Sequence, residues 1–237
     1  MNTAWPQTIA IVIPSYKAVD SLKSFLPDLL EKVPAENICV VDDASDDGTN
    51  AICKEQRITC IVHEKNRGKG AALQSGFTHF LSLNYSWIIT LDADGQHAIT
   101  DLDKLHSATL QQPRPGIIIG NRSKRLGTMP PARIFSNRLT SAILSLLCGC
   151  RISDSQCGYR IYAAEFLRTI TIQYSRFEME SEVILKACAA KFPVVFVPVQ
   201  TLYLNRQSHI SHLSDTMRWI TAVIRVYREI RKQPCNT

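Results

Sequence analysis

Two aspartates and a glutamine follow an apolar run near the middle of the chain, in the sequence SWIITLDADGQH. The run at 87–91 has the composition of a buried strand, so Asp92 and Asp94 are expected to emerge together where that strand meets solvent. Their carboxylates and the amide oxygen of Gln96 would form a hard oxygen cluster, which suits Mg²⁺ or Mn²⁺ and leaves coordination positions for phosphate oxygens. The spacing therefore predicts a metal site for a phosphorylated ligand, with capping of the next helix as the structural alternative.

Polar residues also follow the first two predicted strands of the chain. The strand at 9–13 runs into Pro14 and Tyr16, and the strand at 38–41 runs into Asp43, a candidate acceptor of hydrogen bonds from a nucleobase or a ribose. In parallel sheets, ligands bind beyond the carboxyl ends of the strands. These residues and the two aspartates described above are therefore expected to form one site.

A glycine-rich turn, NRGKGAA, precedes a helical pattern that begins at Lys69. The backbone N–H groups at the start of this helix and the ammonium of Lys69 could face the phosphates of a nucleotide. The turn has neither the Walker-A spacing nor the G-x-G-x-x-G spacing of dinucleotide-binding proteins, so a plain helix-entry turn is the alternative.

Predicted strands and helices alternate through the first half of the chain. Further strands are predicted at 60–62 and 117–119, and helices at 19–32, 48–56, 69–83 and 99–111. Strands that are buried on both faces and joined by helices predict an α/β fold with a mainly parallel sheet flanked by helices. The second half is less regular, with predicted helices at 134–148, 177–190 and 212–232 and a strand at 194–199. We expect one domain at 1–211, followed by a basic amphipathic helix and tail at 212–237.

The composition is that of a globular protein with an uneven distribution of positive charge. The chain has 237 residues, of which 45% are hydrophobic and 20% are charged. Apolar runs do not approach the roughly 20 residues needed to span a bilayer, and the first residues lack the features of a signal peptide, so we expect a cytoplasmic protein. The net charge is +6, and the segment 114–151 holds seven Lys or Arg residues and no acid. This distribution predicts an anionic partner.

Seven motifs together resemble those of family 2 glycosyltransferases, which have the GT-A fold. The match covers about residues 8 to 215, and the motifs are, in order, IAIVIPSYKA, VVDDASDDGT, NRGKGAA, LDADGQH, GNR, DSQCGYR and SHISHLSD. Within this family, the chain is most similar to the branch that contains dolichyl-phosphate mannosyltransferase and bacterial polyprenyl-phosphate glycosyltransferases. The resemblance implies a metal-dependent, inverting transfer of a sugar from a UDP- or GDP-linked donor to a polyprenyl phosphate or another lipid-linked acceptor.

The resemblance also implies roles for individual residues. Positions that hold the nucleotide are matched by Pro14, Tyr16, Val41, Asp43, Asp92 and Ala93, and the metal-ligating pair is matched by Asp94 and Gln96. Positions near the donor or acceptor phosphates are matched by Arg122, Arg133, Arg206 and His209. The chain has Ala18 where the branch usually has an acid and His209 where it often has lysine, so the base of the donor and the identity of the acceptor stay open.

The chemistry of the acceptor decides whether a general base is needed. A lipid phosphate, with a second pKa near 6, is already nucleophilic at neutral pH. A hydroxyl acceptor must lose its proton to a carboxylate, and by the resemblance Asp154 in DSQCGYR occupies the position of that base. Among the nearby acids, Glu180 is a further candidate for a role in the site, whereas Glu178 and Glu182 share a helical face that we interpret as solvated. We favour the phosphate acceptor because the surrounding segments are basic.

The predicted final helix at 212–232 carries apolar residues along one side and basic residues along the other. It could lie on the anionic inner face of the cytoplasmic membrane as a peripheral contact, or pack on the domain with a solvated basic face. Nucleic-acid binding is not expected, because exposed aromatic residues do not alternate with the basic ones. Two other classes remain as alternatives. One is a sugar-phosphate nucleotidyltransferase, but that class needs a glycine-rich basic signature after the first strand, and the segment PSYKAVDS does not contain it. The other is a non-catalytic protein that binds a nucleotide or a lipid.

Overall fold

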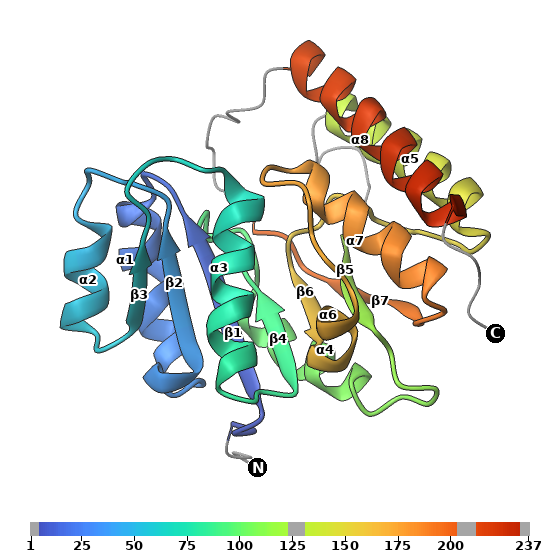
Figure 1. The fold of residues 1–237 in the computed structure, drawn as a ribbon. Helices are drawn as coiled ribbons and strands as arrows, with labels where there is room; N and C mark the ends of the chain where they lie inside the picture. Colours follow the sequence, from blue (N-terminus) through green and yellow to red (C-terminus); the bar gives the residue numbers. More distant parts are fainter. Residues whose placement is uncertain (1–4, 123–130, 203–211, 233–237) are drawn as a thin grey trace.

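The chain folds around one β-sheet that is covered by helices (Figure 1). The computed structural model describes residues 5–122, 131–202 and 212–232, and within them the sheet has seven strands in the order β3-β2-β1-β4-β6-β5-β7. The strands are β1 (Ile9–Ser15), β2 (Ile38–Asp42), β3 (Thr59–Val62), β4 (Trp87–Thr90), β5 (Ile117–Arg122), β6 (Arg160–Ala163) and β7 (Val194–Val199). Neighbouring strands are parallel except that β6 is antiparallel to both β4 and β5. The expected α/β class with a mainly parallel sheet is confirmed.

Helices lie on both faces of the sheet. They are α1 (Val19–Leu30), α2 (Thr49–Glu55), α3 (Lys69–Ser82), α4 (Leu102–Ala108), α5 (Pro131–Cys148), α6 (Ala164–Thr169), α7 (Glu178–Ala189) and α8 (His212–Lys232), with short 3₁₀ helices η1 (Ala35–Asn37) and η2 (Ile99–Asp101). Figure 1 shows α3 and α7 on the same face of the sheet and α1 on the opposite face. Most of the helices predicted from the sequence are present with ends that differ by a few residues.

The centre of the core is built from the strands β1, β2 and β4, whose apolar residues are buried on both faces. Helix α3 packs closely on β1 because Gly76 has no side chain. A Cβ atom at Gly76 would lie 2.4 Å from Cγ1 of Val12, which is far inside van der Waals contact. This close packing fixes α3 against the sheet and thereby fixes Lys69, the first residue of the helix.

Strand β6 and helix α6 were not anticipated from the sequence. The strand begins at Arg160, whose side chain is 0% exposed and would be out of place in an apolar strand pattern. Its guanidinium is accommodated by donating hydrogen bonds to the backbone carbonyls of Ser155, Cys157 and Glu180 at 2.7–2.9 Å. The short strand is therefore stabilised by tertiary hydrogen bonds that a local sequence pattern does not reveal.

The final helix α8 packs on α7 and also keeps an exposed apolar side. Nε1 of Trp219 donates a hydrogen bond of 2.8 Å to Oγ of Ser181 on α7, and Val223 of α8 is buried. Met217 and Ile224 on the same helix remain 62% and 46% exposed. The prediction that this helix packs on the domain is therefore confirmed, and part of its apolar side remains exposed to solvent. Among the described residues, no helix combines the length and the apolar character needed to cross a membrane.

Candidate active site

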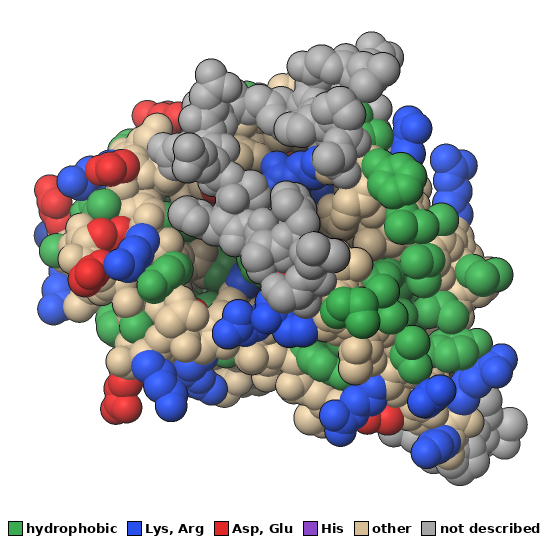
Figure 2. Space-filling model, turned by 90° about the horizontal axis from the view of Figure 1, so that it is seen from above, with side chains coloured by type: hydrophobic (Ala, Val, Ile, Leu, Met, Phe, Trp, Pro, Cys, Tyr) green, Lys and Arg blue, Asp and Glu red, His purple; other side chains and the backbone are tan. Residues whose placement is uncertain are grey.

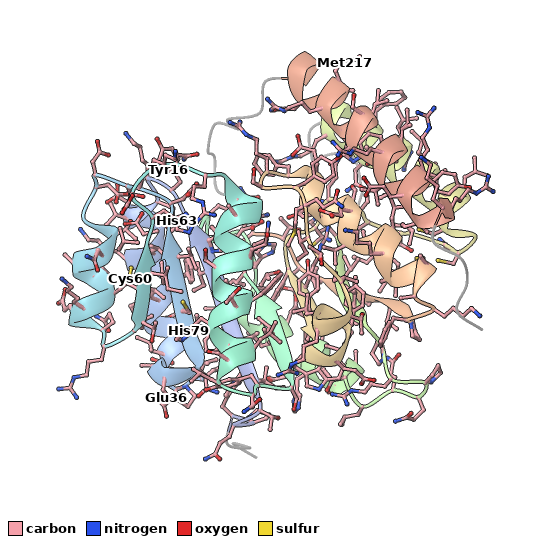
Figure 3. The ribbon with its side chains drawn as sticks, viewed as in Figure 1. Tyr16, Glu36, Cys60, His63, His79 and Met217 are labelled. Carbon is pink, nitrogen blue, oxygen red and sulfur yellow. The ribbon has the colours of Figure 1, made fainter. Side chains whose placement is uncertain are left out.

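Three parallel strands end at the same edge of the sheet and bring the predicted residues together. Ser15 at the end of β1 pairs with Asp42 at the end of β2, and the backbone N–H of Leu91 beyond β4 donates to the carbonyl of Val12 in β1. Tyr16, which follows β1, is 50% exposed and lies at this end of the sheet in Figure 3. The expectation that the three strand ends meet at one edge is confirmed.

The loops at this edge hold one another through short polar contacts. The backbone N–H of Lys17 donates to Oγ of Ser45 at 2.9 Å, and the N–H of Val19 donates to the carboxylate of Asp47 at the same distance. Asp47 also accepts hydrogen bonds from the backbone and hydroxyl of Thr49, where α2 begins. These contacts give Asp47 a structural role and fix the loop that carries Tyr16 before any ligand binds.

Asp43 is buried and joins β2 to the glycine-rich turn. Its Oδ1 accepts hydrogen bonds from Nδ1 of His63 at 2.6 Å and from the backbone N–H of Arg67 at 2.9 Å, and its Oδ2 accepts the N–H of Gly68 at 2.7 Å. The ring of His63 is also in contact with Oγ of Ser75 at 2.9 Å. Sequence reasoning did not single out His63, because it lies beside charged residues just past β3 and matches none of the motifs.

A partly buried ion-pair network surrounds Asp92. Nζ of Lys69 lies 2.7 Å from Oδ1 of Asp92 and 2.7 Å from Oε1 of Glu180, and Glu180 in turn pairs with Arg160. Burial disfavours the charges of both Lys69 and Asp92, but their pairing outweighs it, so that the pKa of Lys69 is raised and the pKa of Asp92 is lowered. Lys69 therefore contributes to the site by holding the carboxylate of Asp92.

The three glutamates of α7 are all buried, so the interpretation of Glu178 and Glu182 as a solvated face is wrong. Their relative exposures are 7% for Glu178, 8% for Glu180 and 1% for Glu182. Glu178 pairs with Arg218 of α8, while Glu182 accepts the backbone N–H groups of residues 173 and 174 and also pairs with Lys186. Each carboxylate has a different partner, which is why a helical-face argument failed.

Asp94 differs from Asp92 and Asp154 because it has no Lys or Arg partner among the described residues. Its Oδ1 accepts the backbone N–H of Gln96 at 2.9 Å in a turn where Gly95 adopts a φ of 70°. The described residues contain no cluster of three or more His, Cys, Asp or Glu side chains that would hold a metal by itself. One carboxylate and one amide oxygen fit a Mg²⁺ or Mn²⁺ ion that takes its remaining ligands from phosphate and water.

Arg122 and Asp154 form a buried pair on the other side of the site. The Nε and Nη2 atoms of Arg122 donate to the two carboxylate oxygens of Asp154 at 2.9 and 3.0 Å, and Nδ2 of Asn137 donates to Oδ1 at 2.6 Å. The side chain of Asp154 is 0% exposed and that of Arg122 is 12% exposed. Burial disfavours the charge of Arg122, but the hydrogen bonds to Asp154 outweigh this effect and raise its pKa.

The remaining predicted residues fall into three groups. Pro14 and Arg133 are half-buried, and Ala93 is 6% exposed. The side chain of Val41 is fully buried in the core, where it supports the floor of the site. Arg206 and His209 lie outside the described residues.

Comparison with solved structures identifies the class of fold. The glucosyl-3-phosphoglycerate synthase from Mycobacterium tuberculosis, in complex with Mn²⁺, UDP and phosphoglyceric acid, superposes with a TM-score of 0.69 at 16% sequence identity. The match covers 96% of this chain and 80% of that chain. The protein thus has the GT-A-like α/β fold of glycosyltransferases.

Sequence comparison identifies the family. The family described as Glycosyl transferase family 2 matches residues 10–171, and the chain belongs to this family. The UDP-N-acetylglucosamine–dolichyl-phosphate N-acetylglucosaminyltransferase of Methanococcus voltae is 30% identical over 217 residues, which cover 82% of this chain and 86% of that protein. The polyprenol monophosphomannose synthase of Mycolicibacterium smegmatis is 29% identical over 222 residues, with coverage of 89% and 82%.

Replacing Asp154 with alanine removes the partner of a buried guanidinium. We expect Asp154→Ala to lower the free energy of unfolding, measured by urea denaturation, by about 3–5 kcal/mol. Asp103→Ala is the matched control, since Asp103 is 78% exposed and pairs with Lys32 at the surface, and it should cost at most about 1 kcal/mol. Equally small losses for both variants would contradict the structural role of Asp154.

Proposed function

We propose that the protein is a metal-dependent, inverting glycosyltransferase that transfers a sugar from a nucleotide-sugar donor to the phosphate of a polyprenyl phosphate. The observation that carries this proposal is the state of Asp154, whose two carboxylate oxygens are held by Arg122 and Asn137 away from solvent. A carboxylate in this position is a poor general base, because it would have to leave a buried ion pair before it could accept a proton. A phosphate acceptor is ionised at neutral pH and needs no base.

The donor side of the proposal rests on the strand ends. The nucleotide would lie over Tyr16 and Asp43, with its diphosphate beside Asp94 and Gln96, which would hold the metal ion together with phosphate oxygens. A bound Mg²⁺ or Mn²⁺ ion would stabilise the negative charge that develops on the departing diphosphate. In an inverting reaction, the acceptor phosphate attacks the sugar from the side opposite the diphosphate.

The acceptor side is basic. Arg122 keeps its charge in a nearly dry position, and a phosphate would be attracted to the remaining face of its guanidinium. We assign Arg133, Arg206 and His209 to the same phosphate-binding region, as the resemblance to polyprenyl-phosphate transferases implies. The relatives from Methanococcus voltae and Mycolicibacterium smegmatis, a dolichyl-phosphate N-acetylglucosaminyltransferase and a polyprenol monophosphomannose synthase, support this acceptor class.

An exposed apolar surface on α5 and α8 supports delivery of the acceptor from a membrane. Its members are Phe135, Leu139 and Leu146 on α5 and Met217, Ile220 and Ile224 on α8, which are between 38% and 83% exposed. Figure 2 shows hydrophobic side chains gathered on this side of the molecule, with Lys and Arg side chains around them. Apolar residues flanked by basic ones favour a peripheral position on an anionic bilayer, at the cytoplasmic face of the membrane.

The acceptor assignment is tested with two lipids of the same chain length. Polyprenyl phosphate and the corresponding polyprenol are offered in matched vesicles with Mn²⁺ and a panel of UDP- and GDP-sugars, and the radioactive sugar transferred to lipid is measured. We expect the phosphate to react at least about 100-fold faster, because the alcohol has no base to accept its proton. Equal rates, or faster transfer to the alcohol, would contradict the proposal.

The metal assignment is tested by replacing the carboxylate that has no cationic partner. Asp94→Ala should abolish Mn²⁺-dependent binding of nucleoside diphosphate and reduce transfer by more than about 100-fold, with little change in the thermal unfolding temperature. Asp46→Ala is the matched control, because Asp46 is an exposed acid that pairs with Lys17 at the surface. Retention of Mn²⁺-dependent turnover by the Asp94 variant would show that the metal is held elsewhere.

A further inference from the structure

Most hydrogen-bond acceptor positions of the Asp43 carboxylate are occupied by donors from the protein itself. Among the described residues, Oδ1 accepts two hydrogen bonds, from His63 and from the backbone of Arg67, and Oδ2 accepts one, from the backbone of Gly68. A carboxylate offers about four acceptor positions, two on each oxygen. One position therefore remains for a ligand, and it is on Oδ2.

The orientation of this carboxylate is fixed by His63. Because a carboxylate only accepts, Nδ1 of His63 carries the hydrogen that it donates to Asp43, and Nε2 lies 2.9 Å from the hydroxyl oxygen of Ser75. The side chains of His63 and Asp43 are 5% and 4% exposed. Rotation of the carboxylate to present both oxygens to a ligand would leave buried donors without partners, which costs about 1–3 kcal/mol for each group.

The sequence leaves open whether the nucleotide sugar contains guanine or uracil, and these two bases require different hydrogen-bond acceptors from such a carboxylate. Guanine presents two adjacent donors, N1–H and the exocyclic N2–H, and a carboxylate satisfies both only by using both of its oxygens. Uracil presents a single N3–H between two carbonyl groups, and one acceptor position satisfies it. The one acceptor position left on Asp43 satisfies the N3–H of uracil but leaves one N–H of guanine unpaired. An unpaired donor in a site without water costs binding free energy, so the site discriminates against guanine.

We infer that the site selects a uridine diphosphate sugar over a guanosine diphosphate sugar, and that His63 is the positioning residue that sets this selection. The inference rests on the proposed function, because it requires Asp43 to face the base of a nucleotide-sugar donor. It adds to that function the class of the donor and a residue outside the recognised motifs. Figure 3 shows His63 below Tyr16, toward the end of the sheet where the site lies.

The first test is calorimetric titration of the full chain with UDP and with GDP in the presence of Mn²⁺. We expect UDP to bind at least about tenfold more tightly, which corresponds to one unpaired buried donor. Equal or tighter binding of GDP would overturn the inference and leave the proposed function standing. Binding of neither nucleotide would overturn both.

The second test is a pair of substitutions at His63. His63→Leu removes the Nδ1 donor, and the ratio of GDP to UDP dissociation constants should fall to within about threefold of one. His63→Asn places an amide N–H near the position of Nδ1 and should keep most of the selectivity. His79→Leu is the control, because His79 lies farther down α3 in Figure 3 and is not in contact with Asp43.

Wild-type selectivity in a folded His63→Leu variant would overturn the role of His63. If that variant does not fold, the ¹⁵N chemical shifts of the His63 ring in the wild-type protein test whether Nδ1 carries the hydrogen. They should show the tautomer with hydrogen on Nδ1, and hydrogen on Nε2 alone would overturn the inference.

Discussion

The candidate active site depends on one largely buried ammonium that holds two carboxylates. Lys69 begins α3, Asp92 follows β4 and Glu180 belongs to α7, so the ion pairs of Lys69 join three elements beneath the site. Loss of the ammonium would remove the closest cationic partner of both carboxylates and leave Glu180 to Arg160 alone. The same arrangement separates the roles of the two aspartates in the D-x-D sequence, because the charge of Asp92 is neutralised within the protein. Asp94 has no such partner among the described residues, and we propose that it binds the metal ion.

On the opposite side of the site, a carboxylate is also neutralised by a cationic side chain of the protein. Asp154 is neutralised by Arg122, so this side offers a retained positive charge and no free base. We propose an ionised phosphate as the nucleophile, because it needs no base. Helix α7 connects the Lys69 network to α8, since Glu180 pairs with Lys69 while Ser181 and Glu178 contact α8. The helix that presents exposed apolar side chains is thus packed directly on an element of the site.

Much of the fold was predictable because its central strands are short apolar runs with polar residues immediately after them. The meeting of Tyr16, Asp43 and Asp92 at one edge follows from the parallel order of β1, β2 and β4. The strand that starts with the buried Arg160 was missed, as was the burial of the glutamates of α7. In both cases a charged residue is buried because its partner comes from a distant part of the chain, and Lys69 and Glu180 are 111 residues apart. Local periodicity carries no information about such partners.

The most direct test of this account is the location of the metal ion. Crystals soaked with Mn²⁺ and a nucleoside diphosphate are measured at a wavelength where manganese scatters anomalously, and the anomalous difference map gives its position. The account predicts one peak about 2 Å from a carboxylate oxygen of Asp94, shared with the diphosphate, while the ammonium of Lys69 stays on Asp92. A manganese ion bound by Asp92 with Lys69 displaced, or one that touches neither aspartate, would contradict the account.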